Sequence, residues 1–572
     1  MKRTKLWLAV LVSFSPLFFV NLVFSQPPSS QTIGGVSKQE KDIEKKKKIE
    51  KQIESPRVQE KAVSSGEVIP VDSGPRVLIR TIKVEGATLL SQAEIQAVIS
   101  QYEGKELTFR EMQKVADLIT DEFRKKGYAT SRAYIPPQNV REGTLIIRVI
   151  EGKVGKVQIE GNKYFKTQLL EKKLALPPAG NFDYSALQRA LVYINEHPDR
   201  TARATLMPGK EAGTTDVLIK VEDKLPIHAG FEYDNYGSRY ISKNRYSLFL
   251  EDNNLLGFDD KLYLKAQMTE ADHLKLYQGR YSFPILEGLD VGAYFVDSAL
   301  KLGKEFKDLD ARGDASIYGL FMTKSLINKS DLDLRYNLGF DYKRIKNYLS
   351  GTQSSRDSLR VLKTGFDLDV NDIWGRNVIL PEINMGFADI LGAMEDKDPN
   401  ASRAGAGAEF TKGLLSYYRL QALPWETTLL WKNSAQYTNN NLCAVEQFQI
   451  GGATSVRGYP PAEKFGDRGL YSSPELSFPI YFLPQDWKVP YNQEKLYDTS
   501  RLVIFYDWGT VRLRNPQAGE KKSDTLRGWG FGYRFNLRDN LSFRVELGYP
   551  LGKKTPSDAR HAHPWVEFTS KF

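Results

Sequence analysis

The feature that most restricts the fold of this chain is a long series of alternating segments in its C-terminal part. From residue 225 to Phe572, short stretches alternate between apolar and polar residues, and turns rich in Asn, Asp, Gly and Ser separate them. The clearest stretch runs from Leu332 to Lys343 and alternates without a break. Because successive side chains of a strand point to opposite faces, these segments are predicted to be strands with one apolar and one polar face.

The placement of aromatic and charged residues favours a barrel in a membrane over a soluble sandwich. The segments from Trp529 to Phe535 and from Leu541 to Tyr549 carry large apolar side chains on one face and Gly, Arg, Glu or Ser on the other. An apolar outer face with aromatic ends and a wet, charged inner face is typical of outer-membrane barrels. Segments of about nine to twelve residues can cross a bilayer as tilted strands. We therefore expect a transmembrane β-barrel over residues 224–572.

The number of candidate segments predicts about sixteen antiparallel strands, and an even number is usual for a bacterial barrel. At that size the bore is wide enough for an aqueous channel. The last segment ends on Phe572 and resembles the terminal signal by which outer-membrane barrels are recognised for insertion. The barrel assembly machinery and outer-membrane lipid are therefore expected partners. The predicted strand centres are Phe231, Leu248, Leu264, Leu276, Val291, Leu320, Tyr336, Phe366, Ile383, Tyr418, Leu430, Phe478, Ile504, Phe531, Val545 and Phe568.

The N-terminal part is predicted to be an export signal followed by a linker. Residues 1–25 combine a basic start with a short, interrupted apolar run and a small residue before Gln26, which is typical of a signal peptide. A retained membrane anchor is the alternative. Residues 26–75 have the composition of a linker and contain a Lys-rich stretch, Lys38 to Ile53, that could form a short helix. This helix is predicted to be either a spacer or a plug in a polar pore.

Two small α/β modules are predicted between the linker and the barrel. Residues 76–152 and 153–223 share one order, in which a strand ending in glycine precedes two helices and two further strands. They resemble POTRA domains, the periplasmic modules fused ahead of outer-membrane barrels. The run from Thr130 to Gln138 with Val149-Ile150-Glu151-Gly152 resembles the first such domain of the hemolysin-activator/secretion transporters. The resemblance implies binding of an extended peptide at an open sheet edge, and a rigid spacer is the alternative.

A long segment without clean alternation, residues 438–470, is predicted to be a functional loop. It contains Gly451-Gly452 and then Val456-Arg457-Gly458-Tyr459. This pattern resembles the inward-folded sixth extracellular loop of two-partner secretion transporters and of the related barrel-assembly insertases. Gly458 is expected to permit a tight backbone turn, and Tyr459 to pack against the wall.

The expected partner of the loop arginine lies about fifty residues later. In the segment from Leu502 to Gly509, alternation points Phe505, Asp507 and Gly509 into the lumen. The pattern Phe-x-Asp-x-Gly resembles the strand motif that receives the arginine in that family. We therefore predict a latch, defined as an ion pair between Arg457 and Asp507 at the inner wall. A surface arginine in an external loop is the alternative.

Composition argues against several other classes of protein. The single cysteine, Cys443, excludes an intramolecular disulfide and any multi-cysteine metal site. The net charge of +10 is modest for 572 residues and does not indicate nucleic-acid binding. The sequence shows no phosphate-binding loop, metal-spaced cluster or catalytic triad. No catalytic residue, metal or cofactor is therefore expected, and the chain is not expected to be an enzyme.

The combined patterns predict a two-partner (type V) secretion transporter of the bacterial outer membrane, with its POTRA domains in the periplasm. The resemblance implies that these domains capture an unfolded exoprotein, such as a large β-helical adhesin, a haemolysin or a haem-binding protein. The barrel would then export that partner under control of the latched loop. The alternative is an outer-membrane assembly factor of the same superfamily, which several more tandem modules would favour. A diffusion porin or an outer-membrane hydrolase fits less well.

Overall fold

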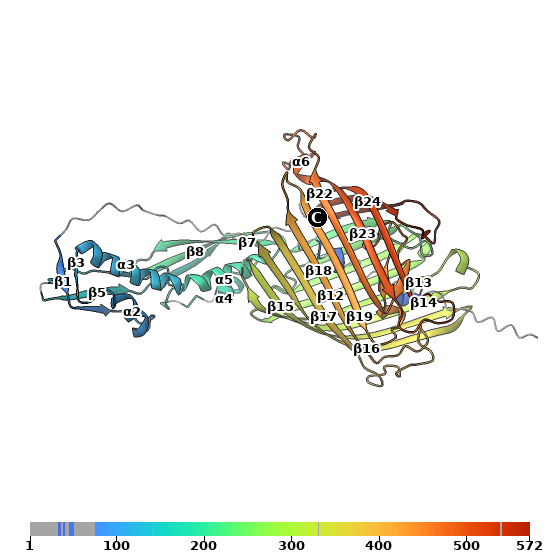
Figure 1. Ribbon diagram of the computed structural model, residues 1–572, viewed down its shortest axis with the longest axis horizontal. Coiled ribbons are helices and arrows are strands. Elements are labelled where there is room, and N and C mark those ends of the chain that lie inside the picture. The colour runs from blue at the N-terminus through green and yellow to red at the C-terminus, as the bar shows by residue number, and fades with distance from the viewer. Residues whose placement is uncertain are drawn as a thin grey trace, which may run out of the picture.

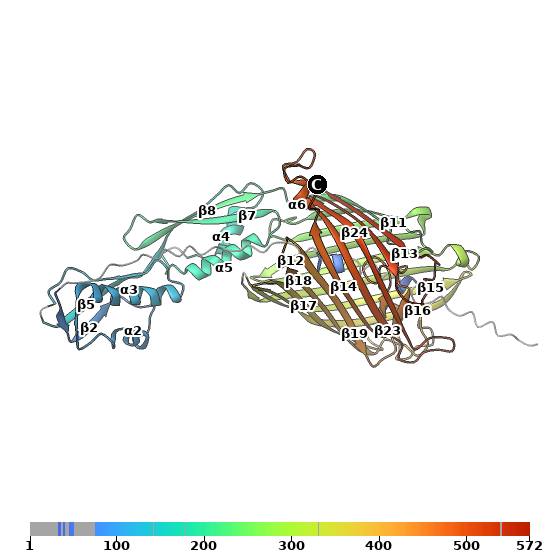
Figure 2. The same ribbon diagram turned by 45° about the horizontal axis from the view of Figure 1, so that its top comes forward.

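The structure is a computed structural model that describes residues 32–35, 38–39, 45–47, 49–50 and 75–572, except residues 141, 175, 178, 330, 538 and 539. Two small modules extend from one end of a barrel whose strands are tilted relative to its axis (Figures 1 and 2). The predicted signal peptide lies outside the described residues, as does most of the linker. None of the described helices is both long and apolar enough to span a lipid bilayer.

The first module is built from β1 (Val77–Ile79), β2 (Thr81–Glu85), α2 (Gln92–Ile99), β3 (Lys105–Leu107), α3 (Phe109–Lys125), β4 (Arg132–Tyr134) and β5 (Thr144–Ile150). Ser91 and Thr108 begin the two helices, and each forms a capping box with the glutamate three residues on. β2 lies parallel to β5, which pairs with β4. The predicted first strand is divided at Arg80, whose backbone N–H donates to Gly143 O at 2.7 Å.

The second module repeats this arrangement without the small β1–β3 pair. It contains β6 (Lys153–Glu160), α4 (Thr167–Leu174), α5 (Tyr184–Asn195), β7 (Arg200–Pro208) and β8 (Thr214–Asp223). Its sheet has the order β6-β8-β7, so β6 and β7 form the two edges. The apolar faces of α4 and α5 pack on this sheet around the buried Leu170, Leu187 and Ile219.

Sixteen strands form a closed antiparallel barrel, and every predicted strand centre lies within one of them. The C-terminal β26 closes the barrel against β9, where the backbone N–H of Phe572 donates to Ala229 O at 2.9 Å. The strands are β9 (Ile227–Asp234), β10 (Arg245–Asp252), β11 (Lys261–Thr269), β12 (Leu274–Leu286), β13 (Leu289–Lys301), β14 (Arg312–Asn328), β15 (Leu332–Leu349), β16 (Thr352–Asp372), β17 (Gly375–Gly386), β18 (Phe410–Ala422), β19 (Thr428–Thr438), β22 (Arg468–Pro479), β23 (Ser500–Arg512), β24 (Ser523–Leu537), β25 (Leu541–Pro550) and β26 (His563–Lys571).

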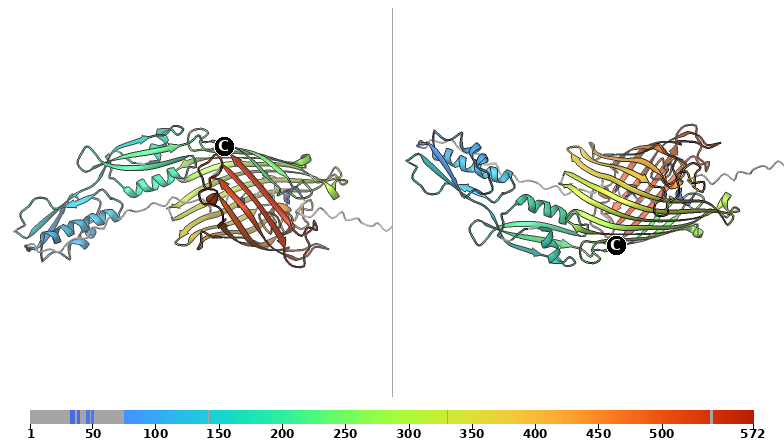
Figure 3. Two further views of the ribbon diagram at one scale, coloured as in Figure 1. Left: turned by 90° about the horizontal axis from the view of Figure 1, so that it is seen from above. Right: turned by 90° about the horizontal axis from the view of Figure 1, so that it is seen from below.

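The two ends of the barrel differ in a way that orients it. The modules join at the start of β9, so the turns at that end are the ones that the sequence predicts to face the periplasm (Figure 3). Large aromatic side chains are exposed in these turns, as in the interfacial belts of membrane barrels; they include Trp374, Trp425, Phe482, Trp487 and Tyr491. The opposite, extracellular end carries the two longest connections of the described barrel, residues 387–409 and 439–467, and the shorter connection of residues 551–562.

Buried polar contacts fix the second module to the first periplasmic turn of the barrel. Arg200 holds both carboxylate oxygens of Asp259 at 2.6 Å. Although burial alone would raise the pKa of Asp259, hydrogen bonds and charge from Arg200 lower it to about 2. Beside this pair, the backbone N–H of Asp199 donates to Nδ1 of His197, whose Nε2 lies 2.8 Å from the backbone oxygen of Asn253. Because Nδ1 accepts a bond, His197 must be neutral here. The hydrogen bonds of neutral His197 and the Arg200–Asp259 pair therefore hold the module in one orientation.

Candidate functional site

The predicted loop folds into the barrel and is connected to its wall at several points. Between β19 and β22, residues 439–467 form a short helical turn, η4 (Ala444–Glu446), and a small hairpin of β20 (Phe448–Ile450) and β21 (Lys464–Gly466). Gly451 and Gly452 follow β20 with φ angles of +105° and +101°, which L side chains rarely adopt. The two glycines turn the chain so that the next residues face β23.

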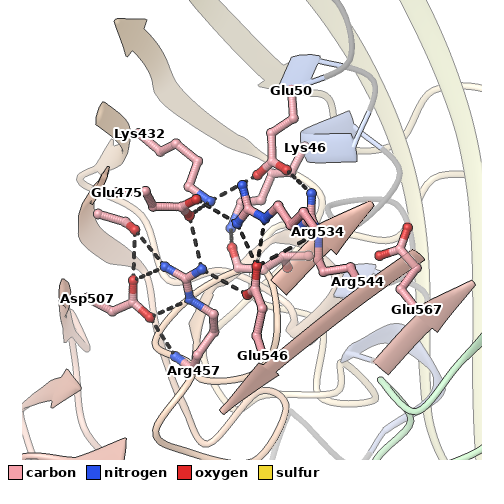
Figure 4. A network of polar contacts seen from close by, with 12 residues as sticks. Lys46, Glu50, Lys432, Arg457, Glu475, Asp507, Arg534, Arg544, Glu546 and Glu567 are labelled. Carbon is pink, nitrogen blue, oxygen red and sulfur yellow. Dashed lines mark hydrogen bonds and ion pairs between the residues drawn. The ribbon is translucent and has the colours of Figure 1, made fainter. Parts of the chain in front are cut away.

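The structure brings Arg457 and Asp507 together in the lumen (Figure 4). Nε of Arg457 donates to one carboxylate oxygen at 2.8 Å, and Nη2 donates to the other at 2.7 Å. The backbone N–H of Arg457 adds a third bond to Asp507 at 2.9 Å. The side chains of both residues are almost inaccessible to solvent, with 1% and 0% of their surface exposed. This fork-on-carboxylate geometry fixes both the position and the orientation of the loop.

The remaining motif residues surround this pair. The central carbon of the Arg457 guanidinium lies over the Phe505 ring, 3.2 Å from the ring centre. A Cβ on Gly458 would meet the backbone of Pro550 at 2.6 Å, so only glycine allows the loop to lie this close to β25. Tyr459 is buried and packs with Val456 in an apolar cluster that also contains Ile450, Tyr471, Val511 and Leu526. Gly509 leaves room for this cluster, since its Cβ would lie 3.1 Å from Val456.

Sequence reasoning missed the other acidic residues that face Arg457. Nη1 of Arg457 lies 2.9 Å from Glu546 and 3.0 Å from Glu475, and Nη2 donates to Ser473 at 3.1 Å. The backbone oxygen of Arg457 accepts a bond from Nε1 of Trp565 at 2.9 Å. Alternation places these residues in the lumen, but their meeting depends on the register of β22, β23, β25 and β26. We call Arg457, Asp507, Glu475, Glu546 and Ser473 the latch cluster.

The loop is also held at a second part of the wall, where the loop supplies the acidic partner and the wall supplies the basic ones. Glu446, in η4, is buried between Lys343 of β15 at 2.5 Å and Lys412 of β18 at 2.7 Å. Nζ of Lys412 also donates to the backbone oxygen of Glu446 at 2.9 Å. At the end of the loop, Asp467 accepts two bonds from Arg403 of the neighbouring 387–409 loop, at 2.7 and 2.8 Å. The loop thus supplies the cation in its ion pair at Arg457 and the anion in its ion pairs at Glu446 and Asp467.

The described residues between 32 and 50, which we call the lumen segment, lie inside the barrel beside this loop. Short stretches of the segment appear within the barrel in Figure 2. Their partners come from separate strands of the wall, including Glu382 of β17, Lys432 of β19 and Glu567 of β26. The lysines that made the stretch unusual in sequence meet acidic wall residues, because Lys45 pairs with Glu382 at 3.3 Å and Lys47 with Glu567 at 3.0 Å.

Glu50 and Ile49 join the lumen segment most closely to the wall. The Glu50 carboxylate accepts bonds from Lys432 at 3.0 Å and Arg544 at 3.2 Å. Those two residues also pair with Glu475 and Glu546 of the latch cluster, so one network includes both the segment and the loop. Ile49 is buried among Val378, Leu380, Tyr418 and Leu430. Lys46 contacts the loop directly by donating to Thr454 O at 2.8 Å.

Two family models match the chain. Residues 213–535 match the family described as haemolysin secretion/activation protein ShlB/FhaC/HecB, and residues 77–152 match the ShlB-type POTRA domain. The chain is 23% identical over 495 residues to the heme/hemopexin transporter protein HuxB of Haemophilus influenzae strain 86-028NP, covering 84% of each chain. It is also 23% identical over 488 residues to the outer membrane transporter CdiB of Dickeya dadantii strain 3937, covering 84% of this chain and 83% of the relative.

A solved structure shares the fold. CdiB from Escherichia coli superposes with a TM-score of 0.74 at 20% sequence identity, covering 94% of this chain and 99% of the other. This likeness includes both the small modules and the barrel, and it agrees with the sixteen-stranded closure described above.

Proposed function

The chain belongs to the haemolysin secretion/activation family ShlB/FhaC/HecB, whose members are two-partner secretion transporters of the bacterial outer membrane, and we propose that its lumen is gated by the latched loop together with the lumen segment. The observation that carries this proposal is the buried network around Arg457, which joins the loop, the wall and Glu50 of the segment. Both elements occupy the path that an exported chain would take. Opening therefore requires these ion pairs to separate.

The cargo is one large exoprotein, captured in the periplasm before it folds. The names of the relatives specify a heme/hemopexin transporter and hemolysin transporters, which supports a haem-binding protein or a haemolysin as the class of partner. The second module offers the longest open edges for an added strand, since β6 and β7 each border only β8. The two described modules fit secretion better than barrel assembly. In this proposal Phe572 is the insertion signal that the assembly machinery recognises.

The lumen segment acts as a plug in the resting transporter. Within the network, four basic side chains (Arg457, Arg534, Arg544 and Lys432) are balanced by four acidic ones (Asp507, Glu475, Glu546 and Glu50). Glu50 is the only one of these eight that belongs to the segment. When the segment leaves, the seven wall and loop members of this network keep one uncompensated positive charge.

The latch is tested by exporting the cognate partner, encoded with the transporter, from cells that carry Arg457→Ala. We expect the variant to insert as a heat-modifiable barrel at the wild-type level and to lose export, because the loop no longer has a defined position. The matched control is Arg560→Ala, which removes an arginine whose side chain is 51% exposed from the nearby extracellular loop. Wild-type export by Arg457→Ala would refute the gating role, and loss of insertion would show that the arginine serves barrel folding instead.

A further inference from the structure

The outer wall of the barrel carries a hollow that the export pathway does not use. It has a volume of about 950 Å³ and lies across the outward faces of β16–β19, β22 and β23, strands that lie side by side in Figure 1. Its lining includes the exposed side chains of Phe366, Ile383, Leu415, Tyr437 and Leu470. The outward Gly413 belongs to the floor, and a Cβ placed there would meet nothing within 4 Å. The surface is thus apolar and concave at the depth of the membrane.

One end of the hollow is strongly basic. Arg468 of β22 and Arg512 of β23 are direct register partners and both point outward, and Lys522 follows in the adjoining loop. Like charges directly opposite each other across two strands destabilise a sheet. Among the residues that the structure describes, no carboxylate forms an ion pair with any of these three. The repulsion is therefore not offset by an ion pair from the described part of the chain.

Arg468 is held in a position suited to an external anion. Its Nε donates to Thr438 O at 2.7 Å, and its Nη2 donates to Asn439 Oδ1 at 2.6 Å. The guanidinium also lies over the Tyr437 ring, with its central carbon 4.3 Å from the ring centre. These contacts fix the plane of the guanidinium beside the hollow and leave Nη1 available. A planar, pre-oriented guanidinium is well suited to phosphate oxygens.

The position of the basic end relative to the bilayer identifies the ligand. β22 begins and β23 ends at the extracellular end of the barrel, so the arginines lie where the headgroups of the outer leaflet are found. The hollow extends from them toward the membrane interior. We propose that this surface binds a phosphorylated lipid of the outer leaflet, with acyl chains in the hollow and phosphate oxygens on Arg468, Arg512 and Lys522.

The two strands that carry the proposed lipid site also carry the latch on their inner face. Tyr471 and Ser473 follow Arg468 on β22, and Asp507 precedes Arg512 on β23. A bound lipid would neutralise the opposed arginines and so stabilise the pairing of these strands beside the latch cluster. The inference does not depend on the proposed gating, since it concerns only the outer surface.

The site is tested with the full-length protein in detergent micelles and native mass spectrometry, using lipid A, phosphatidylethanolamine and inorganic phosphate as probes. We expect lipid A to be retained, and the triple variant Arg468→Gln, Arg512→Gln, Lys522→Gln to bind it at least about tenfold more weakly. The matched control is Lys346→Gln with Arg356→Gln, which removes another outward register pair of like charge that does not line the hollow. It should bind lipid A like the wild type.

A second variant, Gly413→Phe, fills the floor of the hollow and leaves the three basic residues in place. It should weaken the retention of lipid A and leave the retention of inorganic phosphate the same as in the wild type. Equal retention of lipid A by the triple variant and the wild type would overturn the proposal. It would also be overturned if the control pair lost as much lipid A binding as the triple variant. Retention of phosphatidylethanolamine as strong as that of lipid A would also overturn it, because the site would then select no additional phosphate.

Discussion

Replacing Glu50 by glutamine should release the lumen segment without unfolding the barrel. The Glu50 side chain is 10% exposed and accepts bonds from the cations Lys432 and Arg544. Glutamine keeps the size and one acceptor but removes the charge. A hydrogen bond to a charged group contributes about 1.5–3 kcal/mol, so losing one of the two bonds and weakening the other costs about 2–3 kcal/mol.

The lost hydrogen-bond free energy destabilises mainly the plugged state, in which Glu50 contacts the wall. Lys432 and Arg544 keep Glu475 and Glu546 as partners in both states, and the open barrel is unaffected by the substitution because Glu50 has then left the wall. Since 1.4 kcal/mol corresponds to a factor of ten, the ratio of plugged to open barrels should fall roughly 30- to 150-fold. Ile49→Ala should act in the same direction, because this side chain is buried in an apolar cluster of the wall.

Single-channel conductance in planar bilayers measures this ratio. The mature chain should show rare large openings, Glu50→Gln frequent ones, and a deletion of residues 26–70 steady ones. Lys45→Gln is the matched control, because the Lys45 side chain is 44% exposed and pairs with Glu382 at 3.3 Å, and exposed pairs contribute little. If the deletion opens the pore and Glu50→Gln behaves as the wild type, the charge argument is wrong. If the deletion conducts no better than the intact chain, the segment is not a plug.

Three further changes test the loop and the module joint. Asp507→Asn should make the loop of residues 439–467 exchange its amide hydrogens at least tenfold faster, because Arg457 loses its bidentate partner. Glu446→Gln should expose the same loop to external protease, since it removes the acid that bridges Lys343 and Lys412; unchanged cleavage would argue against this second connection. Burial lowers the pKa of His197 to about 4, so the joint should weaken as pH falls from 6.5 toward 4, by about 2 kcal/mol at pH 5. Hydrogen exchange at residues 197–200 measures this loss, and His197→Gln should remove its pH dependence.

Most of the barrel was predictable because one physical signal repeats along it. A strand between lipid and water must alternate, and each predicted centre from Phe231 to Phe568 lies in one of the observed strands. The helices of the modules were equally clear, since Ser91 and Thr108 form the capping boxes that begin α2 and α3. The short strand β3 was not predicted, because three residues carry too little periodicity.

The latch was only partly predictable, because its members come from strands far apart in the chain. Alternation and the motif indicated that Arg457 and Asp507 belong to one site. Nothing in the local sequence of Glu475 or Glu546 shows that they face the same guanidinium, since this depends on the closure of the barrel. Glu446 has no sequence signal at all: its partners, Lys343 and Lys412, lie on strands that precede the loop.

The opposite polarity of the two loop connections bears on how a pore of this kind opens. Arg457 lies in an acidic part of the wall, and Glu446 lies between two lysines on another part. Breaking a buried pair by removing one partner is costly, because the other charge is left without compensation. Withdrawal of the loop would expose both parts of the wall at once, so a route filled with water or with a chain bearing both charges is needed to stabilise the open state. An unfolded exoprotein supplies such a chain, and we infer that its entry, together with hydration of the lumen, offsets the loss of both connections.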